Sequence, residues 1–140
     1  MRTVLVTGGS RGIGKAISIT LGKNYHIVVG YVNSEEKAAE VVSEIIENGG
    51  SANNIEIDIS SKKSVDKAFT TIEETYGSVD ILINNAGITK DNILPRMKED
   101  EWTDVIQTNL TGSFYTAQRA TKQMIKNQWG RIVFISSVVG

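Results

Sequence analysis

The chain has 140 residues and no cysteine, and its 15 Lys and Arg residues nearly balance 16 Asp and Glu residues, for a formal net charge of −1. This balance gives no indication of a nucleic-acid partner, and the lack of cysteine excludes disulfides, thiolate catalysis and cysteine-ligated metal sites. No apolar run approaches the roughly 18 residues of a membrane span, and the chain begins with a strand pattern rather than a signal peptide. We therefore expect a cytoplasmic protein with no membrane partner, forming one domain over residues 1–140.

Five apolar, β-branched runs alternate with helical patterns along the chain. The runs predict strands at residues 3–6, 27–32, 54–59, 79–83 and 131–136. A first helix is predicted from Ile13, Ala16, Ile17 and Leu21, a second from Ser34 as N-cap to Gly49, a third ending at Gly77, and a long helical stretch from about Glu99 to Asn127.

The alternation predicts an α/β protein with a parallel sheet that helices cover on both faces. Right-handed crossovers then give a Rossmann-type, doubly wound sheet with strand order 3-2-1-4-5. Ligands bind to such sheets outside the carboxyl ends of the strands, where the strand order reverses. This rim would bring together four segments: Gly8–Gly14, Asp58, Asn84–Gly87 and Ser136–Ser137.

A glycine-rich turn, residues 7–14 (TGGSRGIG), follows the first predicted strand and opens the first helix. Gly8, Gly12 and Gly14 allow the backbone to turn tightly and to approach a ligand closely. The helix that follows directs its unpaired N–H groups toward a bound anion. Three residues separate Gly8 from Gly12, where the general dinucleotide fingerprint has one, but the strand–turn–helix context still predicts a pyrophosphate site.

The end of the second predicted strand indicates which dinucleotide binds. NAD-binding folds commonly have an acidic residue there, about 20 residues past the turn, that binds the ribose 2′-hydroxyl. No Asp or Glu occurs between Ile27 and Ser34, and Asn33 and Ser34 stand at this end instead. The missing acid, together with Arg11 as a forked partner for a 2′-phosphate, predicts NADP(H). The alternative for Arg11 is a solvated surface arginine.

Two motifs together, TGxxxGxG at residues 7–14 and Asn84-Asn85-Ala86-Gly87, resemble the short-chain dehydrogenase/reductase family. The stretch 87–102 (GITKDNILPRMKEDEW) and Thr108-Asn109-Leu110 are most similar to its 3-oxoacyl-acyl-carrier-protein reductases, with acetoacetyl-CoA reductases as close relatives. The resemblance implies NADPH-dependent reduction of a 3-oxoacyl thioester, carried by acyl-carrier protein or CoA, in fatty-acid synthesis. In this family a tyrosine gives the proton and a lysine lowers that tyrosine's pKa.

The resemblance also implies roles for particular residues. Asp58 would meet the adenine amino group, with the Ile59 amide beside it. The full cofactor-binding set would be Gly8, Ser10, Arg11, Gly12, Ile13, Gly14, Asn33, Ser34, Asp58, Ile59, Asn85, Ala86 and Gly87. In catalysis Asn109 would hold a water of the proton relay and Ser137 would hydrogen-bond the substrate carbonyl; no metal site is implied. From the residues alone, Asp58 could instead cap a helix, Asn109 could be an exposed helical residue and Ser137 the polar end of a strand.

The chain departs from the family pattern at its end. The family's tyrosine and lysine, four residues apart, lie beyond the serine, whereas the chain stops at Gly140 and none of its tyrosines has a lysine four positions later. An apolar, β-branched fifth strand at the sheet edge resembles an interior strand without its neighbour. We therefore expect the N-terminal portion of a single-domain reductase, truncated before a sixth and a seventh strand and inactive alone.

Two alternatives to this function remain. The chain could be a non-catalytic dinucleotide-binding or assembly module, pairing through its fifth strand or through the helices of residues 99–127. It could also belong to a reductase of another small ketone. Full-length relatives assemble as tetramers partly through those helices, so the resemblance implies a homo-oligomer.

Overall fold

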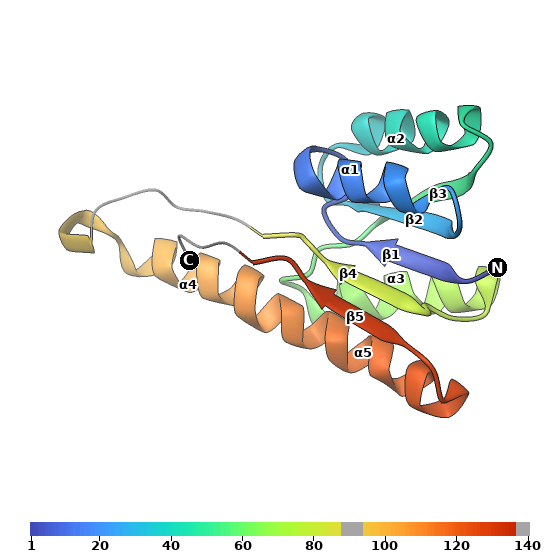
Figure 1. Ribbon diagram of the computed structural model, residues 1–140. Helices are drawn as coiled ribbons and strands as arrows, with labels where there is room; N and C mark the ends of the chain where they lie inside the picture. Colours follow the sequence, from blue (N-terminus) through green and yellow to red (C-terminus); the bar gives the residue numbers. More distant parts are fainter. Residues whose placement is uncertain (88–93, 137–140) are drawn as a thin grey trace.

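The structure, a computed structural model, describes residues 1–87 and 94–136. Its centre is one parallel sheet made of β1 (Thr3–Val6), β2 (His26–Tyr31), β3 (Ser51–Glu56), β4 (Ile81–Asn84) and β5 (Arg131–Phe134). The strands lie in the order β3-β2-β1-β4-β5, and every paired neighbour runs parallel (Figure 1). The predicted Rossmann-type order is therefore confirmed, and the order reverses at β1 and β4.

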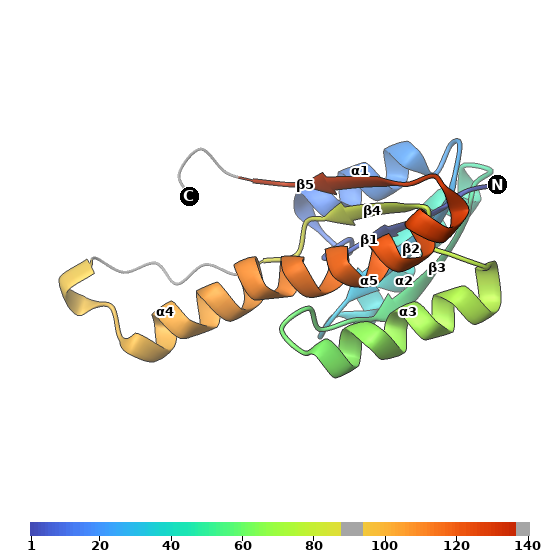
Figure 2. The same cartoon turned by 90° about the horizontal axis from the view of Figure 1, so that it is seen from below.

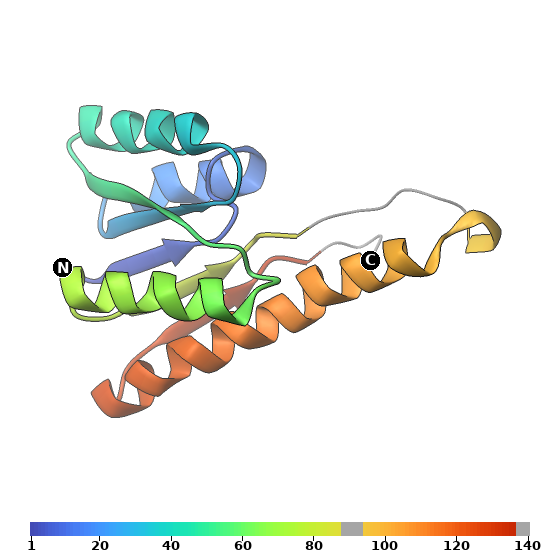
Figure 3. The ribbon, with the colours of Figure 1, turned by 180° about the vertical axis from the view of Figure 1, so that it is seen from behind.

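Helices cover both faces of the sheet. On one face lie α1 (Gly12–Leu21) and α2 (Glu35–Glu47), and on the other α3 (Lys62–Tyr76) and α5 (Gly112–Asn127) (Figure 2). A 3-10 turn at Leu94–Arg96 precedes α4 (Glu99–Val105), which continues through a π-helical segment, Ile106–Thr111, into α5. Residues 99–111, here called the helical arm, extend past the carboxyl ends of the strands (Figure 3). The long predicted helical stretch is thus present, but as three parts.

The sheet is buried on both faces, as its near-continuous apolar strands predict. Alternate strand residues point to opposite faces. On the face of α3 and α5, Leu5, Val28 and Leu82 form a core with Phe69. The intervening strand residues form a second core on the face of α1 and α2: Val4, Val6, Ile27, Val29, Ile81 and Ile83, packed with Ala38, Val41 and Ile45.

The third strand was predicted three residues too late. β3 spans Ser51–Glu56 rather than 54–59, because its pairing with β2 begins with Ser51 opposite His26. Ile57 and Ile59, whose apolarity indicated strand, lie in the connection to α3 and are buried there. The other boundaries differ less: β2 is His26–Tyr31 rather than 27–32, β4 is Ile81–Asn84 rather than 79–83, and β5 is Arg131–Phe134 rather than 131–136.

The face of α1 that meets the sheet is only partly the predicted one: Ile17 and Leu21 pack against the core, but Ile13 and Ala16 do not. Ile13 is 63% exposed and Ala16 is exposed, whereas Gly14 and Ser18 are the buried residues of this helix. The Ser18 hydroxyl donates to the carbonyl of Gly14 at 2.9 Å, so its polar group is satisfied inside the helix. Small residues therefore bring α1 close to the sheet, and this keeps the start of the helix near the end of β1.

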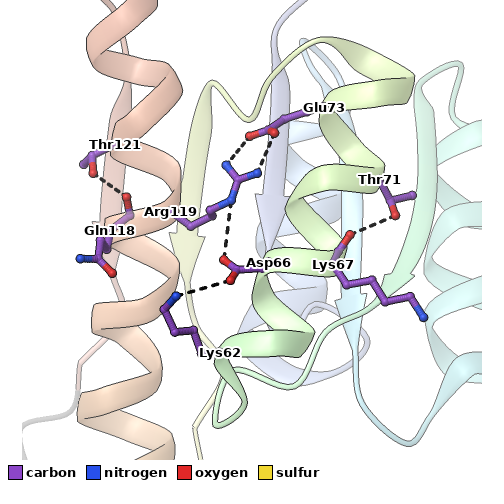
Figure 4. Close-up of polar contacts among 8 residues, drawn as sticks. All are labelled: Lys62, Asp66, Lys67, Thr71, Glu73, Gln118, Arg119 and Thr121. Carbon is purple, nitrogen blue, oxygen red and sulfur yellow. Dashed lines mark hydrogen bonds and ion pairs between the residues drawn. The ribbon is translucent and has the colours of Figure 1, made fainter.

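A half-buried ion-pair network joins α3 to α5 (Figure 4). Arg119 of α5 donates through both terminal nitrogens to the carboxylate of Glu73, at 2.6 and 2.8 Å, and its Nε lies 3.7 Å from Asp66. Asp66 in turn lies 3.5 Å from Lys62. The hydrogen bonds that Arg119 donates to Glu73 raise the pKa of Arg119, against the opposing effect of burial. This forked contact fixes α5 against α3.

The fifth strand lies at one edge of the described sheet, as predicted. Val133 is 44% exposed and Phe134 is 57% exposed, in contrast to the fully buried strand β1. Within residues 1–87 and 94–136, no helix combines the length and apolar character needed to cross a membrane.

Candidate functional site

The glycine turn after β1 is closely packed against the turn after β4. Gly8 has a φ of +61°, a conformation that favours glycine, and a Cβ there would lie 3.0 Å from the Cα of Ala86. A Cβ on Gly14 would overlap the carbonyl oxygen of Gly8 and lie 2.5 Å from the Nδ2 of Asn85. That Nδ2 donates to the Gly8 carbonyl at 3.0 Å. Neither position has space for a side chain, so both require glycine. The two glycines thus allow the turns after β1 and β4, which are far apart in sequence, to pack together at one rim.

Thr7 provides a second link between these two turns. Its buried hydroxyl accepts hydrogen bonds from the backbone N–H groups of Asn85 and Ala86, at 3.1 and 3.0 Å, and donates to the carbonyl of Ile83 at 3.3 Å. A hydroxyl has one donor and two acceptor positions, so Thr7 uses its full capacity. Polar groups at the end of β1 and at the end of β4 thus hydrogen-bond to each other.

A cleft of about 400 Å³ lies at this rim, where the strand order reverses. Its lining comes from the turns after β1, β2, β3 and β4 and from the helical arm: Gly8, Ser10, Arg11, Tyr31, Val32, Asn33, Ser34, Asp58, Ile59, Asn85, Ala86, Gly87 and Thr108. The predicted residues Gly12, Ile13 and Gly14 are not among the lining residues and form the first turn of α1. The cleft thus brings together most of the predicted cofactor-binding residues from four separate segments.

Three lining residues were not predicted. Tyr31 and Val32 directly precede Asn33, and Thr108 directly precedes Asn109, so each adjoins a residue that the motifs had indicated. The pKa of Tyr31 is raised, first by partial burial and then by the carboxylates of Glu35 and Glu56. The Tyr31 side chain is therefore neutral in the cleft at physiological pH.

Asp58 stabilises the connection between β3 and α3. Its Oδ1 accepts hydrogen bonds from the backbone N–H and the hydroxyl of Ser60, at 3.0 and 2.6 Å. The helix cap of α3 is Ser61, whose hydroxyl accepts from the N–H of Ser64 at 3.2 Å. Asp58 therefore caps its own turn rather than the helix. Ser34 occupies the N-cap position of α2 as predicted, but its side chain makes no capping hydrogen bond.

Asn109 lies in the π-helical segment, opposite the turn after β4. A Cβ on Gly87 would lie 2.9 Å from the Oδ1 of Asn109, so these two residues are in close contact. The Ser113 hydroxyl donates to the main-chain carbonyl of Asn109 at 2.7 Å. Such π-helical turns occur frequently at functional sites. Ser137, the second predicted catalytic residue, lies outside the described residues.

The end of β4 is also joined to α5 by a buried polar pair. The Asn84 side chain is 5% exposed, and its Oδ1 accepts a hydrogen bond from the hydroxyl of the fully buried Thr116 at 2.7 Å. Its Nδ2 has no hydrogen-bond partner within the described residues. This pair fixes the first turns of α5 beside the cleft.

Comparisons with known proteins agree with this arrangement. A family model described as short chain dehydrogenase matches residues 2–140. The chain is 46% identical over 140 residues to the 3-oxoacyl-[acyl-carrier-protein] reductase FabG of Staphylococcus aureus (strain N315), covering 99% of the chain and 57% of the relative. It is 41% identical over 139 residues to the protein of the same name from Haemophilus influenzae, covering 99% of the chain and 56% of the relative.

A solved structure is similar over nearly the whole chain. A metagenomic short-chain oxidoreductase in complex with NADP matches with a TM-score of 0.93 and 33% sequence identity, over 98% of this chain and 62% of that one. The chain thus spans a little over half the length of the relatives that it matches. The family model, however, covers all but the first residue. On this match and on its doubly wound sheet, the chain belongs to the short-chain dehydrogenase family of oxidoreductases.

Proposed function

We propose that this chain is the NADP(H)-binding portion of a reductase that converts a 3-oxoacyl thioester into the 3-hydroxyacyl form. The observation that carries the proposal is the cleft at the strand-reversal point, with the glycine turn, Arg11 and Asn33–Ser34 along one wall. The relatives named as 3-oxoacyl-[acyl-carrier-protein] reductases support the substrate class, carried by acyl-carrier protein or CoA. The structural relative in complex with NADP supports the cofactor.

The residues of the cleft fit a dinucleotide. The turn between β1 and α1 presents backbone without side chains at Gly8 and Gly14, where any Cβ would meet the turn after β4. This packing holds the start of α1 at the rim, where its unpaired N–H groups would face a pyrophosphate. At the β2 end of the cleft Arg11 is exposed, and Asn33 and Ser34 stand where an acid would repel a 2′-phosphate. The donor set therefore suits NADP(H) rather than NAD(H).

When bound, the nicotinamide of this cofactor supplies the hydride. The residues of the chain would bind and orient: Arg11 the 2′-phosphate, Asp58 and Ile59 the adenine, and Asn85, Ala86 and Gly87 the adenosine ribose. Asn109 would hold a water beside the turn after β4, and Ser137 would donate to the substrate carbonyl. The tyrosine and lysine of the proton relay would come from sequence outside residues 1–140, and we expect no turnover from these residues alone.

Cofactor preference tests the role of Arg11. In Arg11→Ala, NADPH binding should weaken by about 10- to 100-fold, the value of charge-assisted hydrogen bonds, while NADH binding stays unchanged. Calorimetric titration of both cofactors measures this difference. Arg2→Ala is the matched control, because Arg2 packs over Trp129 at the amino ends of the strands, away from the cleft. Equal loss of both cofactors in Arg11→Ala would contradict the assignment.

The substrate class is tested on the protein that carries this chain, purified at its native length. Its intact mass, compared with 15.3 kDa for residues 1–140, gives the length of any further sequence. Oxidation of NADPH upon addition of acetoacetyl-CoA or an acetoacetyl-acyl-carrier protein is the expected result. NADPH binding without that oxidation would contradict the acyl-thioester assignment. Activity on a small ketone would then indicate a different reductase, and no activity a non-catalytic module.

A further inference from the structure

The cleft wall formed by Asp58 and Ile59 is contacted from two sides. On the α3 side, the N–H of Asp58 donates to the hydroxyl of Ser64 at 2.9 Å. On the other side, the Nε2 of Gln107 donates to the carbonyl of Ser60 at 2.9 Å. Figure 3 shows this connection between β3 and α3 reaching the start of α5. The wall is therefore held between α3, which packs on one face of the sheet, and the helical arm.

A close backbone contact accompanies the Gln107 hydrogen bond. A Cβ on Gly112 would lie 2.8 Å from the carbonyl oxygen of Ile59, so α5 begins directly against the cleft wall. Between these two contacts lie Thr108, which lines the cleft, and Asn109, which meets Gly87. The segment 107–112 thus contacts the cleft or its wall at several positions. Among the described residues, Gln107 makes the side-chain hydrogen bond that joins this segment to the 58–60 wall.

The chemistry of this bond requires an amide. The acceptor is a peptide carbonyl, which has no proton to give, so the group that meets it must be a donor. A carboxylate of the same size could only accept, and a thioether, which is a weak acceptor, could not donate. Gln107 is half-buried, which shields the bond partly from competition by water.

We infer that Gln107 is a positioning residue that couples dinucleotide binding to the helical arm. The inference rests on the proposed function, because a dinucleotide must contact Asp58 and Ile59 for the coupling to operate. Such a ligand orders the 58–60 wall, and Gln107 transmits that order to Thr108 and Asn109 in the next positions of the chain. Coupling between two sites is reciprocal, so an arm held by Gln107 also favours the form of the wall that binds the dinucleotide.

Hydrogen exchange with NADPH as the probe tests this coupling in the protein that carries this chain, purified at its native length. In the unmodified chain, saturating NADPH should slow amide exchange over residues 106–112 by about two- to tenfold, the range of one net hydrogen bond. In Gln107→Met the slowing should be lost from this segment, while it persists in the glycine turn after β1. NADPH binding should weaken by about two- to tenfold in the same variant.

Two further variants make the result specific. Gln107→Glu keeps the length and polarity of the side chain but removes the donor, and it should behave like Gln107→Met. Gln118→Met removes an exposed amide from α5, away from the cleft, and should behave like the unmodified chain. A purely structural role for Gln107 would lower stability without separating the responses of the arm and the glycine turn.

The remaining outcomes distinguish failure of the coupling from failure of the proposed cofactor. If the Gln107 variants keep NADPH-dependent slowing over residues 106–112, or if the unmodified chain binds NADPH without it, the coupling is wrong while the proposed cofactor stands. If neither the unmodified chain nor Gln118→Met binds NADPH, the proposed cofactor itself fails, and the coupling fails with it.

Discussion

The turn after β1 and the helical arm both contribute residues to the same cleft, but they are held in different ways. In the turn, backbone packs against backbone, and no space remains for a side chain at Gly8 or Gly14. The Thr7 hydroxyl uses all of its donor and acceptor positions. Every residue of the arm, 99–111, is exposed or half-buried, and its positions depend on a few side-chain contacts. The glycine turn is thus held by close backbone packing, whereas the region of Asn109 is held by fewer contacts and is more exposed.

The largest expected effect comes from filling the closely packed glycine turn. In Gly14→Val the new side chain overlaps the Gly8 carbonyl and Asn85, so we expect loss of NADPH binding and a decrease of about 1–3 kcal/mol in the free energy of unfolding. Titration calorimetry and urea unfolding measure the two effects. The control is Gly77→Val, at a positive φ with open space around it, which should lose stability through strain but keep NADPH affinity. Retained binding in Gly14→Val would mean that the turn is not the pyrophosphate site.

An intermediate effect is expected from the network that holds α5. Arg119→Ala leaves Glu73 half-buried without its partner, so the free energy of unfolding should fall by about 2 kcal/mol. Glu73→Ala should cost less, because the Nε of Arg119 keeps Asp66 at 3.7 Å. The double variant should cost less than the sum, because the second change removes the unpaired charge. Lys62→Ala, which breaks an exposed pair, should cost less than about 0.5 kcal/mol. Additive losses in urea unfolding would show that the two side chains are not coupled.

The smallest effect on the fold is expected on the outer face of the arm and α5. Leu110 and Phe114, about one helical turn apart in sequence, are 66% and 57% exposed. We propose that this face contributes to a homo-oligomer of the reductase. Phe114→Glu should leave unfolding nearly unchanged and shift the mass in light scattering toward the monomer. Ile46→Glu, at an exposed position of α2, serves as control. An unchanged mass in Phe114→Glu would place any interface elsewhere.

The same contrast explains what could be predicted from the sequence. Strand order and the cleft followed from alternating patterns and from glycines at a strand–turn–helix junction, because local geometry determines both. The start of β3 was missed because Ile57 and Ile59, which follow the strand, are also apolar, since both are buried in the core. The part of the buried face of α1 formed by Gly14 and Ser18 was missed, because hydrophobic periodicity does not detect small or polar residues. Ile17 and Leu21, which were predicted, pack against the core.

The helical arm was the least predictable part. The motif around Asn109 indicated a functional residue, but no local pattern indicated that residues 106–111 form a π-helix. Likewise, nothing in the sequence joins Gln107 to Ser60, since that bond depends on how α5 lies against the wall after β3. Contacts between elements that are distant in sequence require the packed structure.

Thr7 has a consequence for how this rim can evolve. Valine has nearly the same shape but would leave the N–H groups of Asn85 and Ala86 without their acceptor, whereas serine would keep the hydroxyl's hydrogen bonds and lose only a methyl group. Substitution at this position is therefore confined to hydroxyl side chains, independently of any cofactor. The hydrogen bonds of Thr7 also join the loops after β1 and β4, so a ligand that displaces one of these loops displaces the other as well.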